Sequence, residues 1–283
     1  MGLDQCCRPA ATRWREAHEI VAGKGLKYTR PAMDPTQATG TGASPGLQFL
    51  VIGVGRGGTS LLAGMLDYNS KLHVDFEHEA KATLVFAEPQ PGIDRLTSRS
   101  AAFRAACDAK AAQHVGQIYG NKITTEQILA LHGWGPRNPA EPEPVLRHFF
   151  DEAMSGAKVV FIVRDGRTCV RSKVNRKGMT PGEACQLWQY GVGVLRFLRA
   201  RGERLHEVRY EDLVEDPERV LRGVCGFLGV PFEEGMLEGV ENPQMQPTYR
   251  QGEVDASKLD LAGVPPGTAE ILDDELRELG YVG

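Results

Sequence analysis

Apolar residues gather in short runs along this chain, and polar segments rich in glycine and proline separate the runs. Two runs, Leu47–Ile52 and Val159–Val163, have the length and the almost wholly apolar character of strands buried on both faces of a parallel sheet. The stretch Lys71–Phe76 indicates a further strand. The pattern therefore predicts a sheet built from strands that lie far apart in the sequence.

Helical patterns follow these strands. We expect one helix over Thr59–Tyr68 and another over residues 166–178, each directly after a predicted strand. Alternating strands and helices are typical of an α/β fold in which helices cover both faces of a parallel sheet. The sequence thus predicts a parallel sheet flanked by helices, with a P-loop-like turn after its first strand.

Capping signals mark two later helices. Thr180 and Glu183 have the spacing of a capping box, and Pro181 stands at the first helical position between them. A second helix is expected to begin after Asp216, at Pro217, and to stop at Gly229.

The first 46 residues differ in composition from the rest of the chain. Residues 1–46 contain a short helical candidate at Thr12–Val21 and then a tract rich in Pro, Gly, Thr and Ser, so we interpret them as an extension with a linker. Residues 47–283 then form one domain. Within it, the proline-rich run Gly133–Pro144 is expected to be a surface loop.

Composition excludes several classes of protein. The 283 residues carry a formal net charge of −4, which argues against a protein that coats nucleic acid, so any anion site must be local. No apolar run approaches the roughly 20 residues of a membrane-spanning helix. The first residues lack the apolar core of a signal peptide, so a cytoplasmic location is expected.

Cysteines add little to this picture. Gly2 with Cys6 and Cys7 leaves lipidation open, although a frayed terminus explains them as well. The other cysteines show no metal-ligand spacing and are expected to be reduced and buried; these are Cys107, Cys169, Cys185 and Cys225.

The glycine-rich loop after the first strand is the first candidate site. Gly53, Gly58 and Ser60 stand where a Walker-type loop has them, but Thr59 replaces the lysine that reaches the phosphates of a triphosphate. Backbone N–H groups at a helix start can still bind a 5′-phosphate, with side-chain donors from Arg56, Thr59 and Ser60. A turn that binds no ligand is the open alternative.

A basic segment after the strand Val159–Val163 is the second candidate. Arg164 directly follows the strand, where open α/β sheets bind ligands, and Ser172 lies about two helical turns further on. A second phosphate is expected there. A solvated basic helix face explains Lys173 and Lys177 equally well, but not an arginine next to a buried strand. The other cations of the segment are Arg167, Arg171 and Arg176.

Two phosphate sites in this order resemble those of the PAPS-dependent sulfotransferases, above all the tyrosylprotein branch and bacterial members. The loop GVGRGGTSLLAGMLD resembles their 5′-phosphosulfate loop, and VRDGRTCVRS their 3′-phosphate motif, within a similarity that covers roughly residues 47–283. The resemblance implies a sulfotransferase fold and a donor, PAPS, that leaves as PAP.

The resemblance also implies roles for individual residues. The 5′ end of the donor would be bound by Arg56, Gly57, Gly58, Thr59 and Ser60, and the 3′-phosphate by Arg164 and Ser172 with help from Arg176. Tyr210 matches a position near the donor, although taken alone it is typical of a core residue. Ser257 and Lys258 resemble the late donor-binding loop, which here lacks the family's tryptophan and later lysine.

The same resemblance places the reactive groups. In HVDFEHEAK it puts Glu77 at the position of the general base, with Glu79, His73 and His78 as open alternatives. An ordinary glutamate, with a pKa of about 4.3, would be ionised at neutral pH without special tuning. In YGNKITTEQ, Lys122 matches a lysine expected to stabilise charge, although an exposed lysine at a helix start is the alternative.

The sequence therefore predicts transfer of a sulfuryl group from PAPS, without a metal ion, to an acceptor hydroxyl. The acceptor could be a peptide tyrosine, a phenol or a carbohydrate, and neither nucleic acid nor a membrane span is expected among its partners. Two alternatives stay open. One is a small-molecule or nucleotide kinase with an altered loop, and the other is a nucleotide-binding protein that has lost catalysis.

Overall fold

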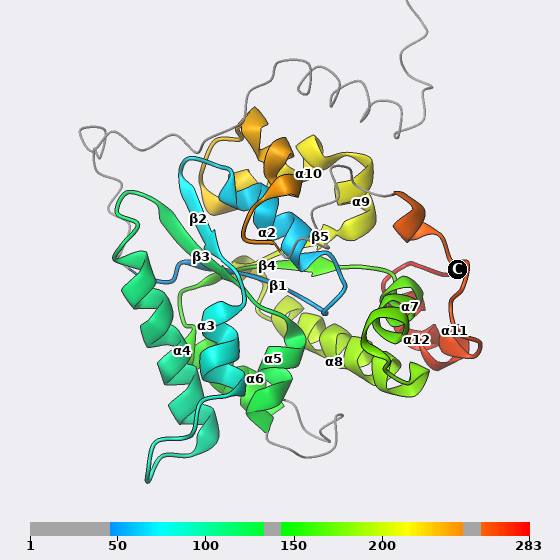
Figure 1. Cartoon of the computed structure of the whole chain (residues 1–283), viewed down its shortest axis with the longest axis horizontal. Helices are drawn as coiled ribbons and strands as arrows, with labels where there is room; N and C mark the ends of the chain where they lie inside the picture. Colours follow the sequence, from blue (N-terminus) through cyan, green and yellow to red (C-terminus); the bar gives the residue numbers. More distant parts are fainter. Residues whose placement is uncertain (1–45, 133–142, 246–255) are drawn as a thin grey trace, which may run out of the picture.

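The computed structural model describes residues 46–132, 143–245 and 256–283 (Figure 1). All but the last residue of the predicted extension, with its helix at Thr12–Val21 and the cysteines Cys6 and Cys7, lies outside these residues. Most of the predicted loop Gly133–Pro144 does so too. The final two positions of that loop, Glu143 and Pro144, already belong to a helix.

Five parallel strands form the sheet, in the order β2-β3-β1-β4-β5. The apolar segment β1 lies at its centre, between the two strands that pair with it, and β2 and β5 form the edges. This arrangement confirms the predicted α/β class. The strands are β1 (Phe49–Gly53), β2 (Leu72–Asp75), β3 (Ile118–Lys122), β4 (Lys158–Val163) and β5 (Leu205–Arg209).

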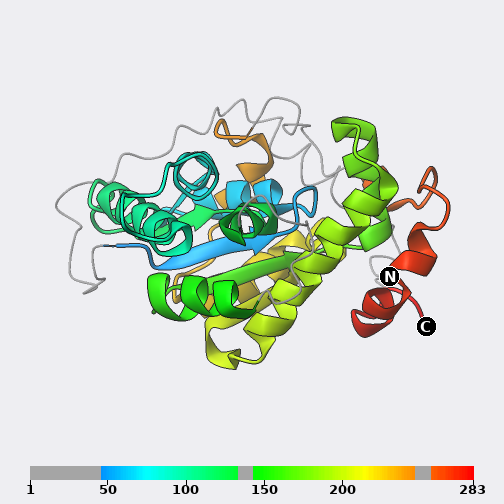
Figure 2. The ribbon, with the colours of Figure 1, turned by 90° about the horizontal axis from the view of Figure 1, so that it is seen from below.

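Helices cover both faces of the sheet (Figures 1 and 2). One face carries α2 (Thr59–Asp67), α9 (Tyr210–Glu215), α10 (Pro217–Leu228) and the 3₁₀ segment η6 (Glu234–Glu241). The other face carries α4 (Arg95–Ala111), α5 (Thr125–Leu129), α6 (Glu143–Arg147), α7 (Gly166–Lys177) and α8 (Pro181–Arg199).

Shorter elements connect or flank these helices. The single turn α3 (His78–Ala80) continues into the π-helical turn η2 (Lys81–Val85), and a second π-helical segment, η4 (His148–Ala153), follows α6. The 3₁₀ turns are η3 (Ala130–His132), η5 (Gly202–Arg204) and η8 (Ala256–Leu259). The chain ends with α11 (Thr268–Ile271) and α12 (Asp273–Glu278), which lie beside α7 and α8 (Figure 2).

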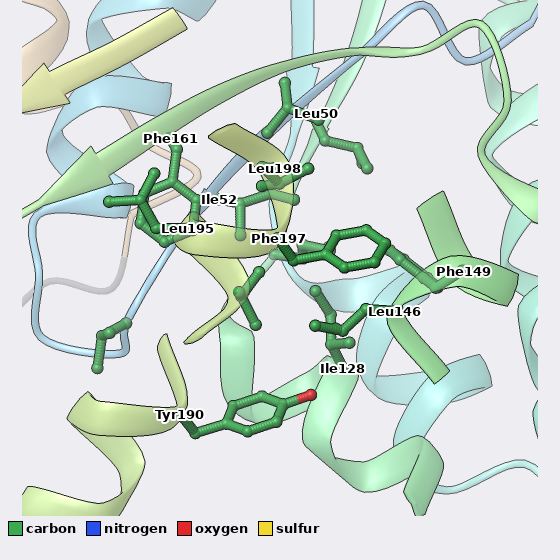
Figure 3. Packing of buried hydrophobic residues seen from close by; sticks show 14 of the residues in the cluster. Leu50, Ile52, Ile128, Leu146, Phe149, Phe161, Tyr190, Leu195, Phe197 and Leu198 are labelled. Carbon is green, nitrogen blue, oxygen red and sulfur yellow. The ribbon is translucent and has the colours of Figure 1, made fainter. Parts of the chain in front are cut away.

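The core consists of two layers, one on each face of the sheet. Alternate residues of a strand point to opposite faces, so Phe49 and Val51 of β1 pack under α2, whereas Leu50 and Ile52 face α8. Figure 3 shows the second layer, in which Leu50 and Ile52 lie near the buried side chains of α8 and of the α6–η4 segment. Because both faces are covered, the central strands have to be apolar throughout.

The capping predictions are confirmed. The Thr180 hydroxyl accepts from the N–H of Glu183 at 3.3 Å and Pro181 opens α8. Asp216 caps α10 by accepting from the N–H of Arg219 at 3.1 Å, and Gly229 ends that helix at φ +82°.

Other features were not predicted or were predicted only in part. The long helix α4 and the strands β3 and β5 had no clear pattern in the sequence, because polar residues interrupt them. Among the described residues, no helix is both long and apolar enough to cross a membrane. The four cysteines at positions 107, 169, 185 and 225 are buried free thiols, as expected.

Candidate active site

The carboxyl ends of all five strands open into one cavity of about 870 Å³. Residues 54–58 follow β1, Glu77 follows β2, Lys122 ends β3, Arg164 follows β4 and Tyr210 follows β5. The ends of parallel strands meet at the same edge of a sheet, which is where open α/β sheets bind ligands. Residues separated by more than a hundred positions thus meet in one place.

The loop after β1 has the backbone of an anion-binding turn. Arg56 adopts a left-handed conformation at φ +77° and Gly58 lies at φ +98°. A Cβ atom at Gly58 would come within 2.3 Å of the Tyr210 ring, so only glycine fits there. A left-handed arginine costs roughly 1–2 kcal/mol, and such strain is typical of functional loops.

The amino end of α2 offers N–H donors to the cavity. Leu62 is the first residue of this helix whose N–H bonds within it, to the carbonyl of Gly58 at 3.1 Å. The amides of Thr59 and Ser60 precede it, and the first N–H groups of a helix have no partner inside the helix. Both residues line the cavity. This end of α2 therefore suits a phosphate.

Two backbone N–H groups of the loop already have partners within the protein, and the expected role of Gly57 in binding the donor stays a prediction. The N–H of Gly57 donates to the carbonyl of Val54 at 2.8 Å, and Gly57 does not line the cavity. The N–H of Gly55 donates to both carboxylate oxygens of Glu126, at 3.1 and 2.9 Å. Gly57 therefore shapes the loop.

Arg164 is a buried cation in the cavity. Its side chain is 6% exposed, and its guanidinium lies 4.3 Å from the centre of the Tyr210 ring. One terminal nitrogen donates to the carbonyl of Arg56 at 3.2 Å and the other to the carbonyl of Lys258. Its Nε has no hydrogen-bond partner among the described residues. A buried unsatisfied donor on a cation favours an anionic ligand.

The other residues expected near the 3′-phosphate differ in their relation to the cavity. Ser172 accepts a hydrogen bond from Arg56 Nε at 3.0 Å, which joins α7 to the loop after β1, but it does not line the cavity. Arg176 is exposed and lines the cavity, as does Lys258 of η8. Arg171 also donates to the Lys258 carbonyl, at 3.3 Å. The side chain of Ser257 lies outside the described part.

Glu77 and Lys122 form an ion pair in this cavity, between Oε1 and Nζ. Lys122 is 2% exposed at the end of β3, so the alternative of an exposed lysine at a helix start is wrong. Lys81 Nζ lies 2.8 Å from the other oxygen, Oε2.

These contacts change the pKa values of both partners. Burial raises the pKa of Glu77, but the charges and hydrogen bonds of Lys122 and Lys81 outweigh it and lower the pKa to about 2. The expected ordinary value of about 4.3 is therefore wrong. Burial lowers the pKa of Lys122, against the opposing charge of Glu77.

The alternative bases do not line the cavity. His73 is buried between Asp67 (3.3 Å) and Asp75 (3.2 Å) and stacks on His114 at 3.6 Å. His78 is exposed, and Glu79 is a buried residue 3.9 Å from Lys110. The structure thus brings only Glu77 of the four candidates to the predicted phosphate sites.

A second ion pair was not predicted. Glu126, at the start of α5, pairs with Lys173 of α7, and both line the cavity. Burial raises the pKa of Glu126, but Lys173 and the N–H of Gly55 together lower it. Nothing in the local sequence marks Glu126, because its partners lie 71 and 47 positions away.

The rest of the cavity wall is largely apolar. Phe86 stands at 72% exposure after η2 and belongs to this wall. Among the residues that the structure describes, no group of three or more His, Cys, Asp or Glu side chains could hold a metal ion. The remaining apolar members are Leu61, Val85, Met179, Val240 and Met245.

Comparison with known proteins finds relatives of this chain. The chain is 26% identical over 253 residues to a protein-tyrosine sulfotransferase of Drosophila melanogaster, covering 81% of this chain and 48% of that protein. It is also 26% identical over 205 residues to protein-tyrosine sulfotransferase A of Caenorhabditis elegans, covering 67% and 52% of the two chains. The chain thus spans about half the length of the curated relatives it matches.

Solved structures share the fold. The sulfotransferase domain from the curacin biosynthetic pathway superposes with a TM-score of 0.55 at 19% identity, covering 82% of this chain and 98% of that one. The sulfotransferase domain from the Synechococcus PCC 7002 olefin synthase gives a TM-score of 0.54 at 20% identity, with 88% and 98% covered. A family model described as "Sulfotransferase family" matches residues 48–234, which include every strand, and the chain therefore belongs to the sulfotransferase family.

Proposed function

We propose that this chain transfers a sulfuryl group from PAPS to the hydroxyl of an acceptor. One observation carries the proposal: a single cavity is lined by two separate anion sites and by a carboxylate–lysine pair. The first anion site is the amino end of α2, and the second is the buried guanidinium of Arg164. Two such sites match the 5′ and 3′ phosphate groups of this donor.

The residues present fit this donor. Arg164 has a buried Nε without a partner among the described residues, which a 3′-phosphate oxygen would satisfy. Tyr210 fixes the guanidinium plane by stacking beneath it. At the other site, the amides of Thr59 and Ser60 would bind the 5′ end together with Arg56, whose Nε is oriented by Ser172.

The donor supplies an activated sulfuryl group, and the chain supplies position and charge. Glu77 would accept the proton of the acceptor hydroxyl, since its carboxylate is ionised and opens on the cavity. Lys122, held 2% exposed at the end of β3, would stabilise the charge that develops on the bridging oxygen. Thr59 or Ser60 would donate a further hydrogen bond to the transferred group. None of these steps needs a metal ion.

The acceptor class is the least constrained part of the proposal. Relatives named protein-tyrosine sulfotransferases favour a tyrosine hydroxyl, and the apolar wall with Phe86 suits an aromatic ring. Phenols and carbohydrates stay as alternatives, because loops at the acceptor side vary among proteins of one fold. The cytoplasmic location stays a prediction from the sequence.

Calorimetric titration of the full chain with PAP, ATP and GTP, each with and without Mg²⁺, tests the donor. We expect tight binding of PAP that does not depend on Mg²⁺. Preference for ATP or GTP with Mg²⁺ would favour the kinase alternative. As a matched comparison, Arg164→Ala should weaken the binding of PAP far more than the binding of adenosine 5′-phosphosulfate, which lacks the 3′-phosphate.

Transfer itself is tested with labelled PAPS and three acceptor sets: acidic tyrosine peptides, simple phenols and oligosaccharides. Label in any set supports the proposed reaction, and the labelled set identifies the acceptor. PAP binding without transfer to any of them would support the nucleotide-binding alternative that lacks catalysis.

A further inference from the structure

Two different lysines hold the two oxygens of Glu77. Lys122 contacts Oε1 from the end of β3, and Lys81 contacts Oε2 at 2.8 Å from the start of η2. The lysines differ in exposure, since the Lys122 side chain is 2% exposed and that of Lys81 is 48% exposed. One contact is therefore locked inside the protein, and the other lies where a second molecule could replace it.

Local backbone geometry produces the Lys81 contact. Glu77 immediately precedes α3, and the N–H of Lys81 donates to its carbonyl at 2.9 Å, so the two side chains share one helical face. Exposed pairs of this spacing contribute little to stability and need no function. This pair differs from them because its carboxylate is also bound to a buried lysine and lines the cavity.

Other charges around Glu77 are already engaged. Glu79, on the same short helix, lies 3.9 Å from Lys110 of α4. Arg99 of α4 donates to backbone carbonyls of Leu84 and residue 87, next to η2. On α5, Glu126 is paired with Lys173. His78, the neighbour in sequence, is exposed. Lys81 and Lys122 are thus the cations that act on Glu77 directly.

We infer that Lys81 is a positioning residue for the proposed sulfuryl transfer: it holds Oε2 of Glu77 toward the cavity until the acceptor hydroxyl replaces it. The inference rests on the proposed function. In the step, the acceptor O–H proton passes to Oε2 and the acceptor oxygen bonds to sulfur. The bond between sulfur and the donor's phosphate oxygen breaks, and PAP leaves with that electron pair. Lys81 meanwhile turns into solvent with its charge.

The displacement solves a chemical difficulty of the resting site. With both lysines in contact, the pKa of Glu77 is about 2, and so weak a base takes a proton poorly at neutral pH. Loss of the Lys81 contact leaves Lys122 in place to stabilise charge and raises the basicity of the carboxylate when the acceptor arrives. The resting pair also keeps Glu77 from turning away from the cavity.

The experiment compares Lys81→Met with Lys71→Met, which removes an exposed lysine that does not line the cavity. The first readout is the titration of Glu77 in the full chain without ligand, measured by infrared difference spectroscopy. The carboxylate signal of Glu77 is identified as the one that is missing in Glu77→Gln. We expect Lys81→Met to raise the pKa of Glu77 by about one unit. Lys71→Met should leave it unchanged, and Lys81→Arg should restore the original behaviour.

The second readout is turnover with PAPS against pH. The acidic limb of kcat/KM should move to higher pH in Lys81→Met, by an amount similar to the change in the pKa of Glu77. The Kd for PAP should stay within about twofold of that of the parent chain. An unchanged Glu77 titration overturns the inference whatever the turnover. A shifted titration with an unchanged acidic limb overturns it too, because Lys81 would then touch Glu77 without acting on the reaction. Absence of turnover in the unmodified chain instead overturns the proposed function, and the role of Lys81 in it.

Discussion

Two carboxylate–lysine pairs line the same cavity and differ in what holds their oxygens. Both oxygens of Glu126 accept from the backbone N–H of Gly55, and Lys173, at 3% exposure, completes the contact. Within the described residues, lysine side chains hold both oxygens of Glu77, and one of these lysines is half exposed.

The difference separates a structural role from a chemical one. A carboxylate fixed by backbone cannot leave its partners without moving the loop, so the Glu126 pair fixes the start of the loop after β1 to α5 and α7. A carboxylate held in part by an exposed lysine side chain can exchange that lysine for a substrate. The number of ion pairs in a cavity therefore says less about catalysis than the nature of their partners.

The largest effect is expected on stability, from Glu126→Gln. The change leaves the buried Lys173 cation without its carboxylate, and breaking a buried pair in this way costs about 3 kcal/mol. Denaturation with urea would measure the loss. The double variant with Lys173→Met should recover part of it, since no unpaired cation remains. A single variant as stable as the parent chain would contradict a structural role for this pair.

The next effect is expected on turnover, from Glu77→Gln. Removal of the proposed proton acceptor should lower kcat by about 10² or more and leave the Kd for PAP nearly unchanged. Steady-state kinetics and calorimetry on the same preparation give both numbers. A parallel loss of PAP affinity would show that Glu77 shapes the donor site, and the contrast with Glu126 would then disappear.

The third prediction concerns the stability of the protein at low pH. The folded pKa of Glu77, about 2, lies below its ordinary value, so its ionised form contributes stability above the unfolded pKa. That contribution should be lost as the pH falls from about 4.5 toward 2. The difference in unfolding free energy between the parent chain and Glu77→Gln, measured by denaturation at several pH values, should narrow over this range. A constant difference would contradict the lowered pKa.

The smallest effect is expected from His78→Ala. This histidine is exposed next to Glu77 and does not line the cavity, so turnover should stay within about twofold. The same assay used for Glu77→Gln measures it. An inactive alanine variant together with an active Glu77→Gln would assign the base to His78 instead.

Much of the fold could be predicted from local pattern. The strands β1 and β4 are wholly buried and so wholly apolar, and the caps at Thr180 and Asp216 rest on residues three positions apart. Strand β3 could not be predicted this way, because its buried positions include Asn121 and Lys122. A strand that ends in a functional site carries polar residues at buried positions, and these interrupt the hydrophobic pattern by which a buried strand is recognised.

The site shows the same division. The glycine spacing of the loop after β1 and the position of Arg164 directly after an apolar strand can both be read from the sequence. Glu126 could not be found, because its importance comes from Gly55 and Lys173, which reach it only through the tertiary fold. The pKa of Glu77 was misjudged for the same reason, since one of its two lysines lies 45 positions away.

The contact between Gly58 and Tyr210 has a consequence for how the protein is made. The glycine lies in the loop after the central strand, and the tyrosine follows the edge strand β5, which is the last of the five in the sequence. A nascent chain that has not yet docked β5 holds the loop but lacks the tyrosine on which Arg164 rests. The proposed binding of a nucleotide at this cavity would therefore report completed folding. By mass action, a bound nucleotide favours the finished domain over every partly assembled form.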